Sequence, residues 1–366
     1  MTVFDPKVPY NELPPLPPSC DLDSAEILQA TIQAARLLAE LKGRSAVLPN
    51  PAILINTIGL QEAKASSEIE NIFTTNDELY RGVDHAQASL SPQAREVLHY
   101  NRALWHGTEQ LRRRPMLTTN FLVGLVNTIK GNTAGVRALP GTRIVNAVTG
   151  EVSYTPPEGE SLIRGKLQDL ELFCNTSDDG LDPLIKMALL HYQFEAIHPF
   201  YDGNGRTGRI LAILYLVFCG LLDQPILYLS RYFIETKSEY YSRLRAVTDA
   251  SEWEPWVLYV LRGVAKTAGM THAQILAMNH LLEQTLDEAR VRLPRHMYSK
   301  DLIEQTFVRP YCRIRHLQEA GLGNRHTCSR YLHQMADAGL LTAKRLGRDN
   351  VFINTRLMDV LGSDRS

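Results

Sequence analysis

The stretch His198-Pro199-Phe200-Tyr201-Asp202-Gly203-Asn204-Gly205-Arg206-Thr207-Gly208-Arg209 lies between two apolar segments and holds most of the concentrated chemistry of the chain. Before it, residues 183–196 carry apolar side chains at helical spacing, which predicts a helix with one buried face. After it, residues 210–222 are apolar except for Gly220, and this run is shorter than the roughly 17–25 residues of a membrane span. The stretch is therefore expected to connect two core helices, the second of them over 206–222.

The residue types of this connector favour phosphate. Gly203 and Gly205 permit positive φ on either side of Asn204, so consecutive backbone N–H groups can point into one hollow. That hollow would lie at the N-terminus of the second helix, where unpaired amides and the helix dipole favour an anion. Arg206 and Arg209 are three residues apart, so they share a helix face and can bind successive phosphates.

Two further side chains complete a candidate reactive site. Asp202 offers a hard oxygen ligand, which suits Mg²⁺ bridging the phosphates. His198 has an ordinary pKa of about 6.5, so it can act as a base around neutral pH. A His-Pro pair alone is usually a loop, and Gly-Asn-Gly alone is usually a tight turn. Their concentration within twelve consecutive positions argues for a functional site.

The connector resembles the pattern of the Fic family, His-x-Phe-x-Asp/Glu-Gly-Asn-Gly-Arg-x-x-Arg, at every defined position. The resemblance implies an all-α enzyme that moves AMP from ATP to a Ser, Thr or Tyr hydroxyl of target proteins, with Mg²⁺ between the phosphates. A branch of the family that transfers phosphoryl groups carries Lys where this chain has Gly205, so the glycine favours adenylyl transfer.

The same resemblance assigns roles to the residues of the connector. His198 would take the proton from the target hydroxyl, Asp202 would hold the metal, and Phe200 would be a core anchor. Arg206 and Arg209 would bind the β- and γ-phosphates. The full set of expected nucleotide contacts in the connector is Asp202, Gly203, Asn204, Gly205, Arg206, Thr207, Gly208 and Arg209.

A second motif precedes the connector. Residues 62–80 are predicted as a helix in which Ser66 and Glu70, four apart, share a face. Such a pair is often only a solvated surface, but Ser66 to Asn71 resembles the inhibitory motif of the family, Ser/Thr-x-x-x-Glu-Gly/Asn. The resemblance implies that Ser66, Glu70 and Asn71 form an inhibitory element, in which Glu70 pairs with Arg209 and takes the place of the γ-phosphate.

Two other segments are candidates for contacts with substrates. Residues 141–154 alternate β-branched and polar residues around a Thr-Gly turn, which predicts a β-hairpin. The resemblance makes it a flap that presents the target through Ile144, Val145 and Asn146, although it could also be a hairpin without function. Tyr240 and Tyr241 could flank an adenine, although aromatic residues at helical spacing are more often core.

The C-terminal region changes character. Helices are expected over 301–308, 311–319 and 324–338 and strands over 340–345 and 350–354, the order of a winged helix-turn-helix domain. This domain could bind DNA or another protein. Its basic residues would be those of the third helix and the wing, namely Arg325, Arg330, Lys344, Arg345 and Arg348.

Composition limits the possible partners and location. The chain of 366 residues has 39 Lys and Arg against 40 Asp and Glu, so no overall charge draws it to nucleic acid or a membrane. Its five cysteines are scattered without a Cys-x-x-Cys pair, which argues against disulfide and zinc frameworks and for the cytoplasm. No signal peptide is visible.

The expected organisation is a Fic-type helical bundle with a hairpin flap, followed by a winged helix-turn-helix domain. The expected parts are an N-terminal region over 1–110, a catalytic core over 111–265, a connecting helix over 266–293 after a break near Gly269, and the C-terminal domain over 294–366. The main hypothesis is that the chain is an autoinhibited adenylyltransferase. The resemblance also suggests a homodimer. The alternatives are a nucleotide-sensing transcriptional regulator and an enzyme that removes AMP with Glu70 positioning a water molecule.

Overall fold

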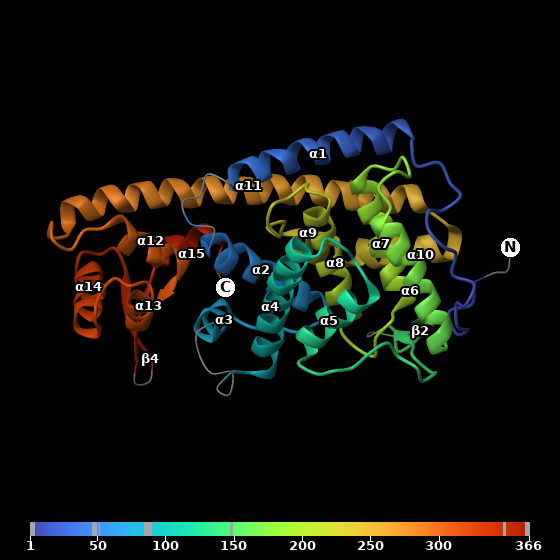
Figure 1. Cartoon of the computed structure of the whole chain (residues 1–366), viewed down its shortest axis with the longest axis horizontal. Helices are drawn as coiled ribbons and strands as arrows, with labels where there is room; N and C mark the ends of the chain where they lie inside the picture. Colours follow the sequence, from blue (N-terminus) through green and yellow to red (C-terminus); the bar gives the residue numbers. More distant parts are fainter. Residues whose placement is uncertain are drawn as a thin grey trace.

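The computed structural model of the chain describes residues 4–45, 50, 52–83, 90–146, 149–346 and 349–362. The fold is mainly helical, with two small antiparallel sheets, as the sequence predicts (Figure 1). In chain order the elements are α1 Ala25–Ser45, α2 Ala52–Ile69, α3 Asn76–Gly82, α4 Pro92–Arg113, α5 Thr119–Lys130, β1 Ile144–Val145, β2 Val152–Tyr154, α6 Glu160–Asn175, α7 Pro183–Ile197, α8 Asn204–Phe218, α9 Leu229–Glu235, α10 Lys237–Ala250, α11 Trp253–Arg292, α12 Lys300–Val308, β3 Tyr311–Cys312, α13 Ile314–Glu319, α14 Arg325–Asp337, β4 Thr342–Leu346, β5 Asp349–Ile353 and α15 Thr355–Val360.

Helices α7 and α8 form the centre of the bundle. They pack against each other, and α1, α6 and α11 also contact α7 while α4 and α5 also contact α8. The sequence predicts one buried face for α7, but nearly every residue of this helix is buried, including Lys186 and His191. A helix covered on all sides loses its amphipathic pattern. The loop between α7 and α8 is therefore held at both ends by rigid, buried helices.

The longest element is α11, which runs along the whole molecule with α1 lying beside it (Figure 1). The predicted break near Gly269 is wrong, because α11 continues from Trp253 to Arg292. A glycine inside a helix costs about 1 kcal/mol relative to alanine. Contacts of α11 with α1, α7, α12 and α15 offset such a cost. The predicted connecting helix over 266–293 is thus the second half of α11.

The predicted helix over 62–80 is also wrong in its bounds. Helix α2 ends at Ile69, and Asn71 adopts a left-handed conformation with φ of 61°. Ile72 N donates to Ser67 O at 3.0 Å, which closes the turn. Asparagine tolerates this conformation better than most residues, so Asn71 acts here as a helix-ending residue. A new helix, α3, begins after its N-cap Thr75.

The predicted hairpin is present, with short strands. Ile144 pairs with Tyr154 and Val145 with Val152 in an antiparallel arrangement. Asn146 N donates to Glu151 O at 2.8 Å, and Gly150 has a φ of 73° in the turn. Ala147 and Val148, which also belong to the predicted hairpin, lie outside the described residues.

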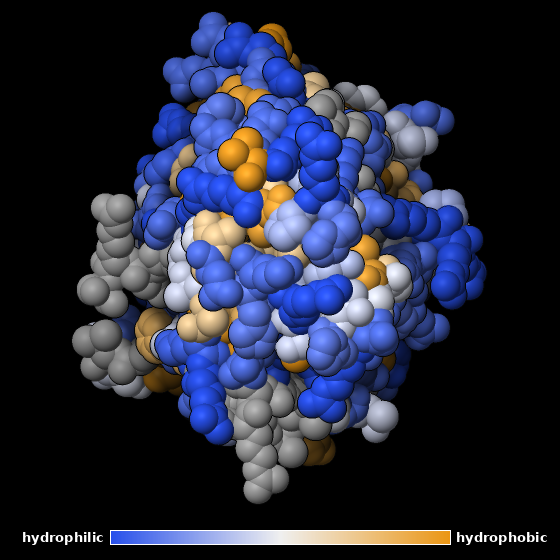
Figure 2. Space-filling view, turned by 90° about the vertical axis from the view of Figure 1, so that its left-hand side faces the viewer, coloured by the Kyte–Doolittle hydropathy of each residue, from blue (hydrophilic) through white to orange (hydrophobic). Residues whose placement is uncertain are grey.

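The C-terminal region from α12 to α15, here called the C-terminal module, has a sheet with strand order β3-β5-β4. The expected helix over 311–319 is partly wrong, because Tyr311 and Cys312 pair with β5 before α13 starts at Ile314. Helix α15 was not expected. The order of helices and strands is otherwise that expected of a winged helix. The end of the molecule that this module forms is mainly hydrophilic (Figure 2).

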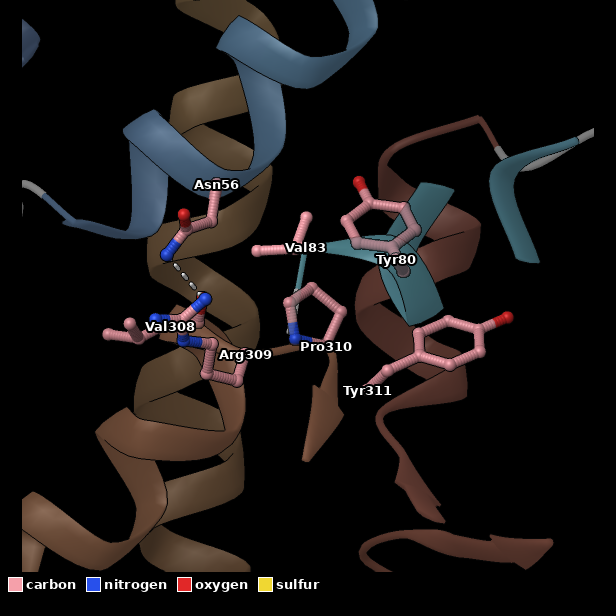
Figure 3. A pocket seen from close by; sticks show the side chains of 7 residues that line it. All are labelled: Asn56, Tyr80, Val83, Val308, Arg309, Pro310 and Tyr311. Carbon is pink, nitrogen blue, oxygen red and sulfur yellow. Dashed lines mark hydrogen bonds between the residues drawn. The ribbon is translucent and has the colours of Figure 1, made fainter. Parts of the chain in front are cut away.

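The C-terminal module packs against α2 and α3. Asn56 Nδ2 of α2 donates to Val308 O at 3.0 Å, beside a small pocket that Tyr80 and Tyr311 also line (Figure 3). The rings of these two tyrosines stack with centroids 5.5 Å apart. Gln61 Nε2 donates to Leu361 O at 2.5 Å. The buried apolar residues of the module belong to the same hydrophobic core as those of the bundle. The domain limits at 110, 265 and 293 remain predictions.

None of the described helices has the length and apolar character needed to cross a membrane. All five cysteines are free, as their scatter in the sequence suggests.

Candidate active site

The loop between α7 and α8 is fixed by its own side chains. His198 ends α7 in a left-handed conformation with φ of 47°. Phe200 is buried, and its backbone N–H and C=O both bond to the side-chain amide of Asn204, at 2.8 and 2.7 Å. Because both amide groups are used in this way, Asn204 offers only its backbone to a ligand. The loop is therefore held in shape by its own side chains.

Glycine is required on each side of Asn204, but for a different reason at each position. Gly203 caps α8 with φ of 82°, as the sequence predicts. Gly205 does not have positive φ, which corrects the prediction for that position, and it lies inside α8. A Cβ atom there would lie 2.8 Å from Glu70 Oε1 and 2.9 Å from Arg209 Nη1. Gly205 is therefore required by the close approach of Glu70 and Arg209 to the first turn of α8.

Thr207 and Gly208, expected among the nucleotide contacts, serve the packing of α8. Thr207 is fully buried, and its hydroxyl donates to Gly203 O at 2.8 Å. A Cβ atom on Gly208 would collide with Glu195 and would lie 2.9 Å from the Phe194 ring. These two residues set the distance between α7 and α8 rather than presenting side chains to a ligand.

Glu70 lies against both arginines of the connector. Its Oε1 is 2.7 Å from Arg209 Nη2, and its Oε2 is 2.8 Å from Arg206 Nε. The sequence predicts the contact with Arg209 but not the one with Arg206. Ser66 adds two hydrogen bonds to Arg209, from Nε to its hydroxyl at 2.7 Å and from Nη2 to its carbonyl at 2.9 Å. Both guanidinium groups are thus engaged by α2 and the turn after it.

A layer of buried polar groups lies beneath Arg209. Glu62 on α2 accepts hydrogen bonds from the Tyr100 hydroxyl at 2.9 Å and from Ser230 N at 2.9 Å, and the Ser230 hydroxyl also contacts it. Burial raises the pKa of Glu62, and these hydrogen bonds and the charge of Arg209 act against that rise. For Arg209, burial alone would lower the pKa, but Glu70 and further neighbours raise it above its ordinary value. The guanidinium stays charged throughout the accessible pH range.

Two residues that the sequence did not indicate continue the charged network. Arg206 Nη1 lies 2.5 Å from Glu96 Oε2 of α4. Lys130 at the end of α5 lies 3.7 Å from that oxygen and 2.6 Å from Asp202 Oδ2. Burial raises the pKa of Asp202, but the hydrogen bond and charge of Lys130, with Arg206, outweigh it, so the pKa is lowered. Asp202 therefore holds a cation at the mouth of the site.

His198 is held in its neutral form. Burial and, to a smaller extent, the charge of Arg137 lower its pKa to about 4, while a hydrogen bond with the backbone of Glu195 opposes the shift. At pH 7 the imidazole is unprotonated, which is the state that a general base requires. Glu195 itself has a pKa raised by burial to about 7, although Arg209 acts against that rise.

Arg137 joins the loop to the flap and was missed by sequence reasoning. Its side chain is 1% exposed. Its Nε donates to His198 O at 2.8 Å, and its Nη2 donates to Ile197 O at 3.3 Å and contacts Pro157 O just after the flap. Its own N–H donates to Pro199 O at 2.9 Å. The carbonyl groups that accept from its side chain lie 20 to 61 residues after Arg137. No local pattern in the sequence predicts contacts over such separations.

The flap lies next to this junction. The Tyr201 hydroxyl accepts hydrogen bonds from Ala138 N and Leu139 N, both at 3.0 Å, and so fixes the chain that leads into β1. In β1, Ile144 is partly buried and Val145 is 48% exposed. Within the described residues β1 pairs only with β2. A strand edge without a partner strand can pair with an extended peptide.

The two tyrosines expected beside the adenine are placed differently from each other. Tyr240 is 1% exposed, and its hydroxyl lies 3.0 Å from His191 Nε2 within a cluster of stacked aromatic rings. Tyr240 is a core residue, and its assignment as a nucleotide contact stays a prediction. Tyr241 is 48% exposed and lies close enough to Glu70 and Arg209 for their charges to affect its pKa. Only Tyr241 can offer a ring face to a base.

Three family profiles match this chain. That of the Fic/DOC family N-terminal region matches residues 28–109, and that of the Fic/DOC family matches residues 89–216. The third, the C-terminal domain of SoFic-like protein adenylyltransferases, matches residues 281–357.

Relatives include a protein adenylyltransferase of Caenorhabditis briggsae, 32% identical over 109 residues, or 30% of this chain and 20% of the relative. A probable protein adenylyltransferase of Aquifex aeolicus is 31% identical over 169 residues, or 44% of this chain and 49% of the relative. The chain thus spans half or less of the length of these relatives.

Solved structures share the fold at low identity. A Fic family protein from Desulfovibrio desulfuricans aligns with a TM-score of 0.54 and 18% identity, over 88% of this chain and 95% of that one. Fic-1 from Caenorhabditis elegans aligns with a TM-score of 0.53 and 20% identity, over 69% of this chain and 74% of that one. Together with the profile matches and the connector geometry, these similarities show that the chain belongs to the Fic/DOC family.

Proposed function

We propose that this chain is a protein adenylyltransferase that transfers AMP from ATP to a Ser, Thr or Tyr hydroxyl of target proteins, and that Glu70 inhibits the transfer. The observation that carries the proposal is the position of the neutral His198 beside the N-terminus of α8, where Arg206 and Arg209 both contact Glu70. The names of the relatives support transfer over nucleotide sensing or AMP removal. A homodimer and a cytoplasmic location remain predictions.

In this reaction His198 accepts the proton of the target hydroxyl. The hydroxyl oxygen forms a bond to the α-phosphorus of ATP, the bond from that phosphorus to the bridging oxygen of the β-phosphate breaks, and pyrophosphate leaves. The amides at the start of α8 and the two arginines stabilise the negative charge on the phosphates. The unpaired edge of β1 would hold the target backbone so that its hydroxyl faces His198.

The residues present fit Mg²⁺. Asp202 has a depressed pKa, its side chain is 61% exposed, and it already contacts the ammonium group of Lys130, so it is suited to a cation. Among the described residues no group of three His, Cys, Asp or Glu could hold a metal. Mg²⁺ commonly uses one or two carboxylates together with substrate phosphates and water. Asp202 would supply the protein ligand, and the ion would neutralise phosphate charge.

Inhibition follows from competition for the arginines. The carboxylate of Glu70 occupies positions on Arg206 and Arg209 that phosphate oxygens would otherwise take. ATP could then bind only with its terminal phosphates displaced, which misaligns the α-phosphorus. A misplacement of about 1 Å can reduce a rate by on the order of a hundredfold.

The position of a labelled phosphate in ATP distinguishes adenylyl transfer from phosphoryl transfer. The Glu70→Gly variant is incubated with Mg²⁺ and ATP that carries the label on either the α- or the γ-phosphate, and labelled protein is measured. Adenylyl transfer predicts label from the α-position only, and none with Glu70→Gly/His198→Ala. Label from the γ-position would instead show phosphoryl transfer, and no label from either position would favour a nucleotide sensor.

A further inference from the structure

The C-terminal module presents one helix with two different faces. In α14, Cys328, Leu332 and Met335 are buried against the rest of the module. The opposite face is exposed and carries the basic and imidazole side chains Arg325, His326, Arg330 and His333. Helix α13 precedes α14 through the turn at Gly321 and Gly323. An exposed second helix after a short turn is the arrangement that places side chains in a DNA groove.

The exposed strand of the module carries more of the same charge. Lys344 and Arg345 are exposed on β4, which pairs with β5 in an antiparallel arrangement. In the part of the chain that the structure describes, Arg325, Arg330, Lys344 and Arg345 make no ion pair with an acidic residue. Elsewhere surface arginines such as Arg164, Arg231 and Arg245 have carboxylate partners. These four cations are therefore available to an external anion.

Charge is divided unequally along the chain. Residues 294–366 contain twelve Lys and Arg against seven Asp and Glu, a net charge of +5. Because the whole chain has a net charge of −1, residues 1–293 carry −6. The near neutrality of the whole chain therefore hides a basic module on an acidic body. Such asymmetry is typical of a polyanion-binding part.

The surface favours a polar partner over an apolar one. Viewed from its end, the module is mainly hydrophilic, with only scattered hydrophobic residues (Figure 2). A stable protein interface usually needs a desolvated apolar centre. The large hydrophobic residues exposed on the described part of the chain include none from α14, β4 or β5.

We propose that the C-terminal module is a winged helix that binds double-stranded DNA. Helix α14, 13 residues or about 20 Å long, would lie in the major groove, whose width of about 12 Å admits a helix. Arg325 and Arg330 would contact phosphates along this groove, and Lys344 and Arg345 of β4 would contact phosphates beside it. This inference is independent of the proposed adenylyl transfer, because no residue of the candidate active site takes part.

The test is fluorescence anisotropy of a labelled 30-base-pair duplex of mixed sequence with the full chain. Four phosphate contacts predict a log–log salt slope of about −3.6, so affinity should fall about 150-fold between 50 and 200 mM salt. Arg325→Ala/Arg330→Ala should weaken binding at least tenfold and halve the slope, whereas Arg325→Lys/Arg330→Lys should keep most of the slope.

The matched control is Arg113→Ala/Arg114→Ala, which removes two exposed arginines at the end of α4, outside the module. It should bind like the unmodified chain. Absence of binding at 50 mM salt would overturn the proposal, as would an equal loss in the control and the α14 variant. Circular dichroism of each variant verifies that exposed substitutions leave the fold intact. Binding to single-stranded DNA but not to the duplex would also contradict it.

Discussion

The carboxylate of Glu70 and the guanidinium of Arg209 lie 2.7 Å apart, although 139 residues separate them in the chain. The contact is possible because α2 ends at Ile69 and the left-handed Asn71 turns the chain over the first turn of α8. Gly205 leaves room for both groups. Ser66, fully buried, holds the same arginine from the last turn of α2. Residues of one short segment thus converge on the α8 N-terminus.

Removing Arg209 should not add to the effect of removing Glu70. In Glu70→Gly the arginine is free for phosphate, so Glu70→Gly/Arg209→Ala should label protein no faster than Glu70→Gly and should bind ATP more weakly. Both quantities can be followed, by label incorporation and by calorimetry. A double variant that is faster than Glu70→Gly would show that Arg209 is not the partner through which Glu70 acts.

Arg137 should matter for the rate more than for ATP binding. Because it fixes the carbonyls of Ile197 and His198 beside the flap, Arg137→Lys should misplace the base and reduce kcat roughly 10- to 100-fold in the Glu70→Gly background. The dissociation constant of ATP should change less than threefold. Arg164→Lys, an exposed substitution on α6, serves as the control. Equal losses in kcat and in ATP affinity would contradict a positioning role.

The pH dependence of the rate should reflect the lowered pKa of His198. A base must be neutral, so the rate rises with pH through its pKa; with a pKa of about 4, His198 is already neutral at pH 6. At saturating ATP, the rate of Glu70→Gly should therefore be nearly flat between about pH 5.5 and 8 with respect to this group.

Glu195 is the control for this profile, because its pKa is raised to about 7 and its own titration falls within the same range. A change of rate near pH 7 that Glu195 causes should disappear in the Glu70→Gly/Glu195→Gln variant. A rise centred near pH 6.5 that persists in this variant would show that the base has an unshifted pKa.

Truncation after Leu293 should lower the stability of the protein but should not abolish its activity. Every residue assigned to the reaction lies before this point, so label incorporation in the Glu70→Gly background should persist. Loss of the Asn56 and Gln61 hydrogen bonds to Val308 and Leu361 should lower the melting temperature. A truncated chain that stays folded by circular dichroism but loses labelling would place part of the active site in the C-terminal module.

The sequence predicted those parts of the site whose residues lie close together in the chain. The glycines, arginines and acid of the connector lie within twelve residues, and apolar residues mark both flanking helices, at helical spacing before the connector and in a continuous run after it. Ser66, Glu70 and Asn71 could be found because their own spacing forms a motif.

Other contacts depend on how distant elements pack. Glu96 and Lys130 reach the site from α4 and α5, and Arg137 from the chain before the flap, so no local spacing reveals them. The second contact of Glu70, with Arg206, depends on the end of α2 at Ile69, where the sequence predicts a continuing helix. Tyr240 and Tyr241 are adjacent, so only packing decides which ring is exposed.

The central claim is that Glu70 restrains a working adenylyltransferase. The most direct measurement is the initial rate of α-phosphate label incorporation into protein at saturating ATP and Mg²⁺, for the unmodified chain, Glu70→Gly and Glu70→Gly/His198→Ala. Release of both arginines predicts a rate for Glu70→Gly at least roughly tenfold above the unmodified chain, and background labelling when His198 is also replaced. Equal rates for the first two proteins, or undiminished labelling without His198, would contradict the account.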